Sequence, residues 1–192
     1  VEDSLRGGGM AMKLCRPIEA KPSDLRLKLY NTGTQIPLSD ILPILENMGL
    51  KVMAEEPYHV KPRDSEKSVW IHDFSAAMAD GRDCELSSVR RVFQDSLARI
   101  WRGEMEDDGF NRLVLGVGLD WRSVAMLRAY CKYLRQAGVP FSQDYMEETL
   151  SKNGDIAVLL SKLFHGMFDP AGKDTAEQRA QQIAAEIEAA LE

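Results

Sequence analysis

The sequence lacks the features that mark most exported, membrane and metal-binding proteins. Its three cysteines are far apart and form no CxxC pair, so neither a disulfide framework nor a zinc site is predicted. It contains no Asn-x-Ser/Thr acceptor, no signal-peptide pattern and no apolar run near the roughly 20 residues of a membrane span. We therefore expect reduced thiols in a cytoplasmic protein with no membrane partner.

Positive charge is also scarce. The 192 residues include 24 Lys and Arg against 30 Asp and Glu, a net charge of −6, which argues against nucleic acid as a partner. A chain of this length can bury roughly 70% of its unfolded surface without a metal or disulfides. Because it starts at Val1 and stops inside a helical pattern at Glu192, we expect a piece of a longer polypeptide.

The hydrophobic period changes from 2 to 3.6 near Asp80, which predicts an α+β half followed by an all-helical half. The clearest strand is LRLKLY, in which leucine alternates with longer polar or aromatic side chains. Before Asp80 we expect a short strand over 12–18, a strand over 25–30, a helix over 39–49, and two strands over 51–60 and 68–74.

Capping residues predict where the helices begin and end. The expected N-caps are Ser39, then Ser87 or Ser88, Asp108, Asp120, Ser142 and Asp155. The last helix, from about Thr175, is rich in Ala, Glu and Gln and has few large apolar side chains to bury. We expect it to pack on something outside this sequence.

No residue is predicted to be catalytic, to bind a cofactor or to ligate a metal. Gly116-Val117-Gly118 follows a helix rather than a strand, so a helix–helix turn is favoured over a dinucleotide loop. His72 and Asp73 are neighbours on a strand and point to opposite faces, a poor geometry for a base and its orienting partner. Cys131 is expected to be buried and inert, and the acidic residues 104–108 to form a solvated loop that caps a helix.

Two sets of residues are candidates for binding. Arg128, Lys132 and Arg135 recur at i, i+4 and i+7 and form one basic helix face. This face is either simply solvated or a contact for an anionic partner, such as an acidic neighbouring domain or a nucleotide phosphate.

The second set lies where a predicted strand leads into a predicted helix. Free amides at a helix start can hold a carboxylate, so this loop is a candidate for binding a small effector. The alternative is a mere connection. The residues concerned are Asn31, Gly33, Ser39 and Asp40.

Long runs of the sequence resemble the large bacterial NAD-specific glutamate dehydrogenase family. They occur in the family's order over roughly residues 24–170. The runs are LRLKLY, IPLSDILPILENMGLKV, EEPYHV, VWIHDF, IWRGEMEDDGFNRLVL, LDWRSVAMLRAYCKYLRQAG, FSQDYMEETL and LFHGMFDP.

The resemblance implies a ferredoxin-like, ACT-like βαββα module (24–103) after a lead-in (1–23) that holds at most one short strand. It implies a helical motif (104–170) and then a linker helix (171–192) toward a catalytic domain outside this sequence. The last strand of the ACT-like sheet has no convincing run after the second helix. Either the 12–18 segment closes the sheet or the sheet remains incomplete.

By resemblance, the parent polypeptide oxidises L-glutamate to 2-oxoglutarate and ammonia and reduces NAD, while this segment holds no cofactor and does no chemistry. Its implied partners are other domains and subunits of the same enzyme, through exposed strand edges or the helical half. An amino acid effector is a further implied ligand. The alternative is a free-standing ACT-type module that binds amino acids.

Overall fold

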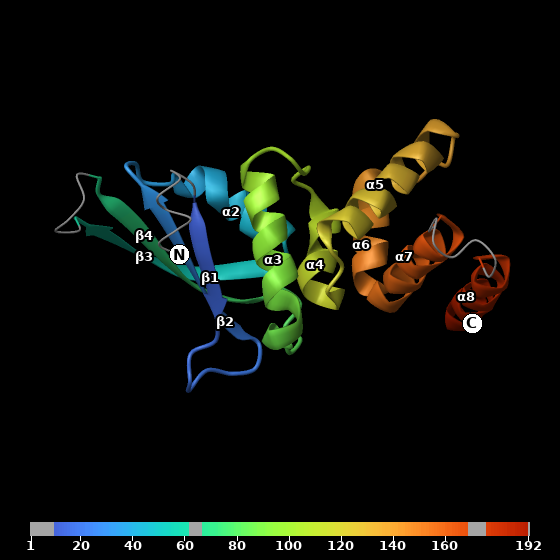
Figure 1. Ribbon diagram of the computed structural model, residues 1–192, viewed down its shortest axis with the longest axis horizontal. Helices are drawn as coiled ribbons and strands as arrows, with labels where there is room; N and C mark the ends of the chain where they lie inside the picture. Colours follow the sequence, from blue (N-terminus) through green and yellow to red (C-terminus); the bar gives the residue numbers. More distant parts are fainter. Residues whose placement is uncertain (1–9, 62–66, 169–175, 192) are drawn as a thin grey trace.

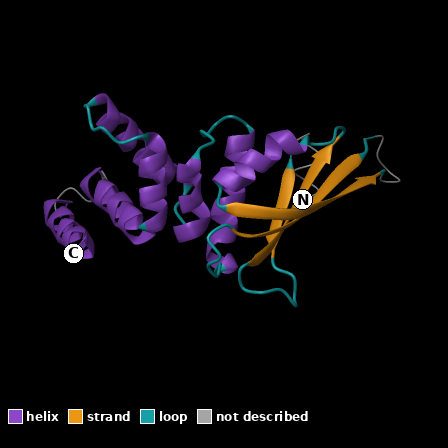
Figure 2. Cartoon of the chain, turned by 180° about the vertical axis from the view of Figure 1, so that it is seen from behind, coloured by secondary structure: helices purple, strands orange, loops and turns teal. Residues whose placement is uncertain are grey.

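The computed structural model describes residues 10–61, 67–168 and 176–191. Strands gather at one end of an elongated molecule, and the helices of the C-terminal half extend away from them to the C-terminus (Figures 1 and 2). The fold is α+β, as predicted: a four-stranded antiparallel sheet with helices, followed by a helical segment.

The sheet has the order β1-β2-β4-β3, and every neighbouring pair is antiparallel. Its strands are β1 (Ala11–Cys15), β2 (Asp24–Thr32), β3 (Leu50–Val60) and β4 (Val69–Met78). The strand missing after the second helix is supplied by β1, so closure by the N-terminal segment is the alternative that the structure shows. This strand ends at Cys15, short of the predicted Ile18, and Pro17 has no N–H to continue the pairing.

One face of the sheet forms the core. Leu25, Leu27 and Leu29 are 0–2% exposed, and Leu27 stands opposite Phe74 of β4. The helices α2 (Leu38–Asn47) and α3 (Leu86–Trp101) supply apolar residues to the same core cluster. The alternation in LRLKLY therefore predicted correctly which side chains of β2 are buried.

The predicted N-caps of these two helices are wrong. Pro37 precedes α2, and the Ser39 hydroxyl donates to Asp40 Oδ1 (3.1 Å) instead of accepting an amide hydrogen. Glu85 precedes α3, and the Ser88 hydroxyl donates to the Glu85 carbonyl (2.8 Å). Both helices begin earlier than the serines, with a leucine as the first residue.

The helical half begins with a short 3₁₀ turn, η1 (Gly109–Asn111). It continues through α4 (Arg112–Val117), α5 (Trp121–Gln136), α6 (Gln143–Lys152), α7 (Gly154–Phe168) and α8 (Ala176–Leu191). Three predicted caps are confirmed: the side chains of Asp108, Asp120 and Ser142 accept amide hydrogens at 2.8–3.2 Å.

The predicted cap at Asp155 is wrong. Asp155 lies in the first turn of α7 rather than before it, because the helix starts at Gly154. A Cβ atom at Gly154 would collide with Val117 of α4. This position therefore packs two helices so closely that no side chain fits between them. The predicted turn at Gly118 is confirmed: α4 ends there with φ +71°, in the left-handed region.

A single hydrophobic cluster runs from the sheet to α7, from Leu14 of β1 to Ala157. In the middle of it, Phe93 and Leu97 of α3 are fully buried. Phe110 of η1, at the start of the helical half, belongs to the same cluster and is also fully buried. The helical segment is thus fixed to the sheet module by shared core rather than by a flexible hinge.

The two edges of the sheet are poorly suited to extend it into another sheet. On β1, the Leu14 amide donates to Gln94 Oε1 of α3 (3.1 Å). On β3, the register shifts between Val52 and Ala54, and Pro57 lacks an amide hydrogen. Bulges, prolines and covered edges are the devices by which sheets avoid edge-to-edge pairing.

Candidate functional site

The loop predicted to bind an effector lies between β2 and α2. The Gly33 amide donates to the Ser68 carbonyl (2.9 Å), and the Asn31 side-chain amide donates to the Thr34 carbonyl (2.8 Å). Ser39 and Asp40 are exposed, on the first turn of α2. These residues share one end of the module, but the polar groups of Asn31 and Ser39 bond locally rather than converging on one point.

A buried histidine ties this loop to the sheet. His72 of β4 is fully buried, and its Nε2 accepts the amide hydrogen of Ile36 (3.1 Å). An atom that accepts this hydrogen carries none of its own, so Nδ1 holds the proton and donates to Glu55 Oε1 (2.9 Å). His72 therefore joins the loop and β3 in the apolar face of the sheet, while Asp73 occupies the opposite face, as predicted.

The predicted basic face is divided between the interior and the surface. Arg128 is 4% exposed and forms a two-point ion pair with Asp108, with distances of 2.6 and 2.8 Å. It also donates to Asn111 Oδ1 (2.8 Å). The anionic group beside Arg128 is thus the acidic loop of the same chain, which was expected to be solvated.

The buried network continues into α6. Gln143 donates to Asp108 Oδ2 (3.3 Å) and to Glu147 Oε1 (2.8 Å), and the Gly109 amide donates to Glu147 Oε2 (3.2 Å). A Cβ atom at Gly109 would collide with the Glu147 carboxylate. This cluster holds η1, α5 and α6 in one arrangement, which neither the acidic loop nor the basic face predicted alone.

The remaining members of the basic face lie at the surface. Lys132 pairs with Glu106 at 2.6 Å, and the two side chains are 43% and 57% exposed. The hydrogen bond from Lys132 lowers the pKa of Glu106. Arg135 is exposed and lines a shallow hollow with Lys132 and Gln136. Lys132 and Arg135 are therefore accessible to a partner, whereas Arg128 is not.

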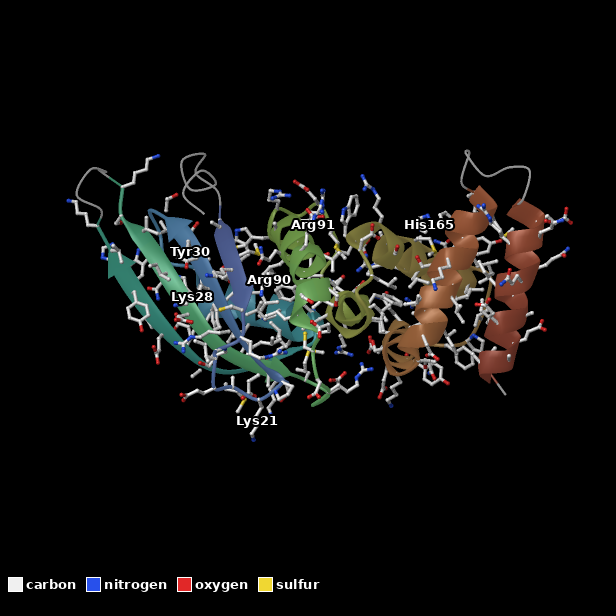
Figure 3. All side chains as sticks on the ribbon, turned by 60° about the horizontal axis from the view of Figure 1, so that its bottom comes forward. Lys21, Lys28, Tyr30, Arg90, Arg91 and His165 are labelled. Carbon is white, nitrogen blue, oxygen red and sulfur yellow. The ribbon has the colours of Figure 1, made fainter. Side chains whose placement is uncertain are left out.

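The face of the sheet away from the helices carries charges that the sequence reading missed. Asp73 of β4, whose side chain is 3% exposed, pairs with Arg26 (2.6 Å) and Lys28 (2.9 Å) of β2. Figure 3 shows Lys28 and Tyr30 along this sheet, and Arg90 and Arg91 on α3. Burial acts to raise the pKa of Asp73, but hydrogen bonds from Arg26 and Lys28 outweigh it and hold the pKa below its ordinary value.

The lowered pKa of Asp73 predicts a loss of stability in acid. A carboxyl group with a depressed native pKa stabilises the fold fully above its unfolded pKa, about 3.9. That stability is lost as the pH falls through the native pKa. The Asp73→Asn variant should therefore unfold more easily than the wild type at pH 7, by about 2 kcal/mol, and the difference should shrink below about pH 4. Urea unfolding at both pH values checks this, and a difference that is constant with pH would contradict it.

A large apolar groove lies between α5, α6 and α7, with a volume of about 610 Å³. Its walls include Leu134, Phe141 and Tyr145, which are 42–52% exposed. Met167 and Phe168 also line it and are 51% and 58% exposed. The sequence reading missed this groove, although the nearly continuous apolar pattern of α7 was a signal for it.

The structure offers no arrangement for bond-making chemistry in the part that it describes. In that part, no group of three His, Cys, Asp or Glu residues could hold a metal ion. Cys15, Cys84 and Cys131 are free thiols. Cys131 is buried, as predicted, and burial raises the pKa of its thiol. No helix within the described ranges is both long and apolar enough to cross a bilayer.

Two family models match most of the described fold. The model for the glutamate dehydrogenase ACT3 domain matches residues 9–89, and the model for glutamate dehydrogenase helical motif 3 matches residues 105–170. The chain belongs to the large NAD-specific glutamate dehydrogenase family. Membership of this family, in its ACT and helical-motif region, is what the sequence runs had predicted.

Three curated relatives are each called NAD-specific glutamate dehydrogenase. The one from Halomonas elongata is 46% identical over 165 residues, the one from Pseudomonas aeruginosa 41% over 168, and the one from Mycobacterium tuberculosis 37% over 170. These alignments cover 86–88% of this chain but only 10% of each relative. The chain therefore spans about a tenth of the length of each of these relatives.

Proposed function

We propose that the chain is a regulatory and assembly segment of a cytoplasmic NAD-dependent glutamate dehydrogenase. The parent polypeptide oxidises L-glutamate to 2-oxoglutarate and ammonia with NAD. The segment itself supplies surfaces rather than catalytic groups. The observation that carries this proposal is the position of the matches: both fall on the ACT3 domain and helical motif 3 of the enzyme.

Within this proposal, the main role is assembly. The loop of Asn31, Gly33, Ser39 and Asp40 has few polar groups directed at a common point, which makes it a weak effector site. The accessible surfaces are instead the apolar groove and, on α5, the side chains Lys132 and Arg135. These are suited to contacts with other domains or subunits of the parent enzyme.

The test compares the complete enzyme with a form that lacks residues 10–168 of this segment. Sedimentation should show a smaller assembly for the deleted form, and glutamate-dependent NADH formation should fall although the catalytic domain is unchanged. An unchanged assembly mass together with unchanged activity would rule the proposal out. A paired variant, Lys132→Glu with Arg135→Glu, keeps the segment in place and tests the same surface without a deletion.

A second candidate function is binding of a free amino acid. It is favoured by the loop at the start of α2, where Asp40 lies in the first turn and Gly33 adopts a φ of +89°. Calorimetric titration with a panel of amino acids, including glutamate and aspartate, distinguishes the two. Saturable binding that is lost on Asn31→Ala would support a sensor, and no heat across the panel would leave assembly as the function.

A further inference from the structure

The groove between α5, α6 and α7 is unusual for the surface of a protein that stands alone. It has a volume of about 610 Å³, and its lining is almost entirely apolar. Six large apolar or aromatic side chains that line it are at least 40% exposed: Tyr130, Leu134, Phe141, Tyr145, Met167 and Phe168. Concentrated exposure of this kind marks a surface that another chain segment covers.

The helix α7 explains why the groove exists. Along α7, Leu160, Phe164 and Met167 line the groove at helical spacing. Its opposite side is covered by α8, where Ile183 lies close to the position of Gly166. A helix that is apolar on most of its circumference is normally buried on all of it. In this structure α4, α5, α6 and α8 cover parts of α7, but Met167 and Phe168 stay more than half exposed, so its groove side is not fully covered.

The shape of the groove selects the kind of partner. Three helices wall it, and the exposed side chains follow helix faces rather than a strand edge. The edges of the sheet are interrupted, by Gln94 at β1 and by the bulge and Pro57 at β3, so strand addition is disfavoured. An amphipathic helix is the element that fills an apolar groove, with anchors at i, i+3 or i+4, and i+7.

The length of the relatives indicates which polypeptide supplies that helix. This chain corresponds to 10% of each curated relative, so each relative holds about nine times as much polypeptide outside the matched part. A second copy of this chain is a poorer candidate, because a symmetric contact requires one patch that is complementary to itself, and a concave groove is not. The α8 helix of a second copy is also a poor occupant, because it consists mainly of Ala, Gln and Glu.

The geometry points to one occupant: an amphipathic helix from another part of the same enzyme polypeptide, seated between α5, α6 and α7. This inference rests on the proposed function and deepens it, since it names the surface through which the segment docks. It also assigns a role to the exposed aromatic residues Phe141 and Tyr145, which line the groove and whose rings stack with centroids 4.9 Å apart.

Photo-crosslinking in the complete enzyme tests the inference. A benzophenone amino acid replaces Tyr145 in the groove or, as the matched control, Tyr58 of β3, which is similarly exposed (52% and 48%). The expected product from position 145 joins this segment to residues three or four apart in a helix elsewhere in the same polypeptide. Position 58 should give no such product.

A substitution in the groove provides a second test. Replacing the exposed Phe141 with aspartate should lower the yield of the crosslinked product about tenfold. The control, Ile18→Asp, changes a fully exposed position far from the groove and should leave the yield unchanged. Products that join two copies at the groove, shown with a mixture of isotope-labelled and unlabelled enzyme, would overturn the inference in favour of self-association. Absence of any product beyond this segment would overturn it as well.

The two proposals fail in different ways. If deletion of residues 10–168 changes the assembly but position 145 gives no product, the segment assembles the enzyme through another surface and the groove inference is wrong. If the deletion changes neither assembly nor activity, the proposed function is wrong, whatever position 145 binds.

Discussion

Replacing Arg128 with alanine is expected to lower the free energy of unfolding by about 3–5 kcal/mol, as when one partner of a buried ion pair is removed. The guanidinium is 4% exposed and donates to both oxygens of Asp108 and to Asn111 Oδ1. Alanine would leave the Asp108 carboxylate, which is only 12% exposed, without its cation. Equilibrium unfolding in urea, followed by far-UV circular dichroism, measures the loss.

Lys132 provides a matched control on the same helix. It is four residues from Arg128 and also pairs with the acidic loop, through Glu106 at 2.6 Å, but this pair is exposed to solvent. Lys132→Ala should therefore cost at most about 1 kcal/mol. Equal losses for the two variants would show that burial does not set the strength of these pairs. Arg128→Lys should also lose much of the stability, since an ammonium cannot bind both oxygens in the same plane.

Removing Arg128 should also change the walls of the apolar groove. The same network reaches Gln143 and Glu147 of α6, and α5 and α6 form two of the three groove walls. A partly opened network should let α6 move relative to α5. If the apolar groove holds a helix of the parent enzyme, Arg128→Ala should weaken that contact even though Arg128 does not touch the groove.

The sequence predicted the fold class and most element positions because the patterns are local. Leu25, Leu27 and Leu29 alternate in a strand that has one buried face, and the caps Asp108, Asp120 and Ser142 accept hydrogens from amides two or three residues away. The strand β4 was predicted to end at Phe74 but continues to Met78. Its last part, Ser75-Ala76-Ala77, has small side chains that give no strong period.

The binding surfaces were less predictable because they depend on contacts between distant residues. A basic stripe and an acidic loop were both visible, but their pairing joins Arg128 to Asp108 across 20 positions. The charges on the sheet face join Asp73 to Arg26 across 47 positions. The two wrong serine caps have a more local cause. Ser39 and Ser88 are good cap residues, but the helices begin earlier, at Leu38 and Leu86, so both serines lie inside the first turn.

Family membership was predictable for a different reason. It depends on long ordered runs and not on any one contact, so it holds even where single caps were wrong. The groove is the reverse case: its lining comes from α5, α6, α7 and the loop between α5 and α6, and only packing shows which apolar residues remain uncovered. Surfaces of this kind set the partners of a segment, and they are the part of its function that sequence patterns describe least.

Replacing His72 with leucine is expected to cost about 3 kcal/mol, the sum of two unsatisfied polar groups. Leucine fits the apolar face between Leu29 and Pro57, the residues opposite His72 in the register. It offers no acceptor to the Ile36 amide and no donor to the Glu55 carboxylate, which is 13% exposed. Ile36 is itself 2% exposed, so water does not readily replace the lost acceptor.

The matched control is the other histidine of the same sheet that the structure describes. His59 of β3 is exposed and stacks on Trp70 with ring centroids 4.4 Å apart, so His59→Leu should cost only about 0.5–1 kcal/mol. Hydrogen exchange adds a local measurement, because the Ile36 amide should exchange faster in His72→Leu and not in His59→Leu. Unchanged protection of Ile36 in His72→Leu would mean that the histidine does not anchor the loop from β2 to α2. Faster exchange confined to that loop would identify His72 as the residue that sets its position above the sheet.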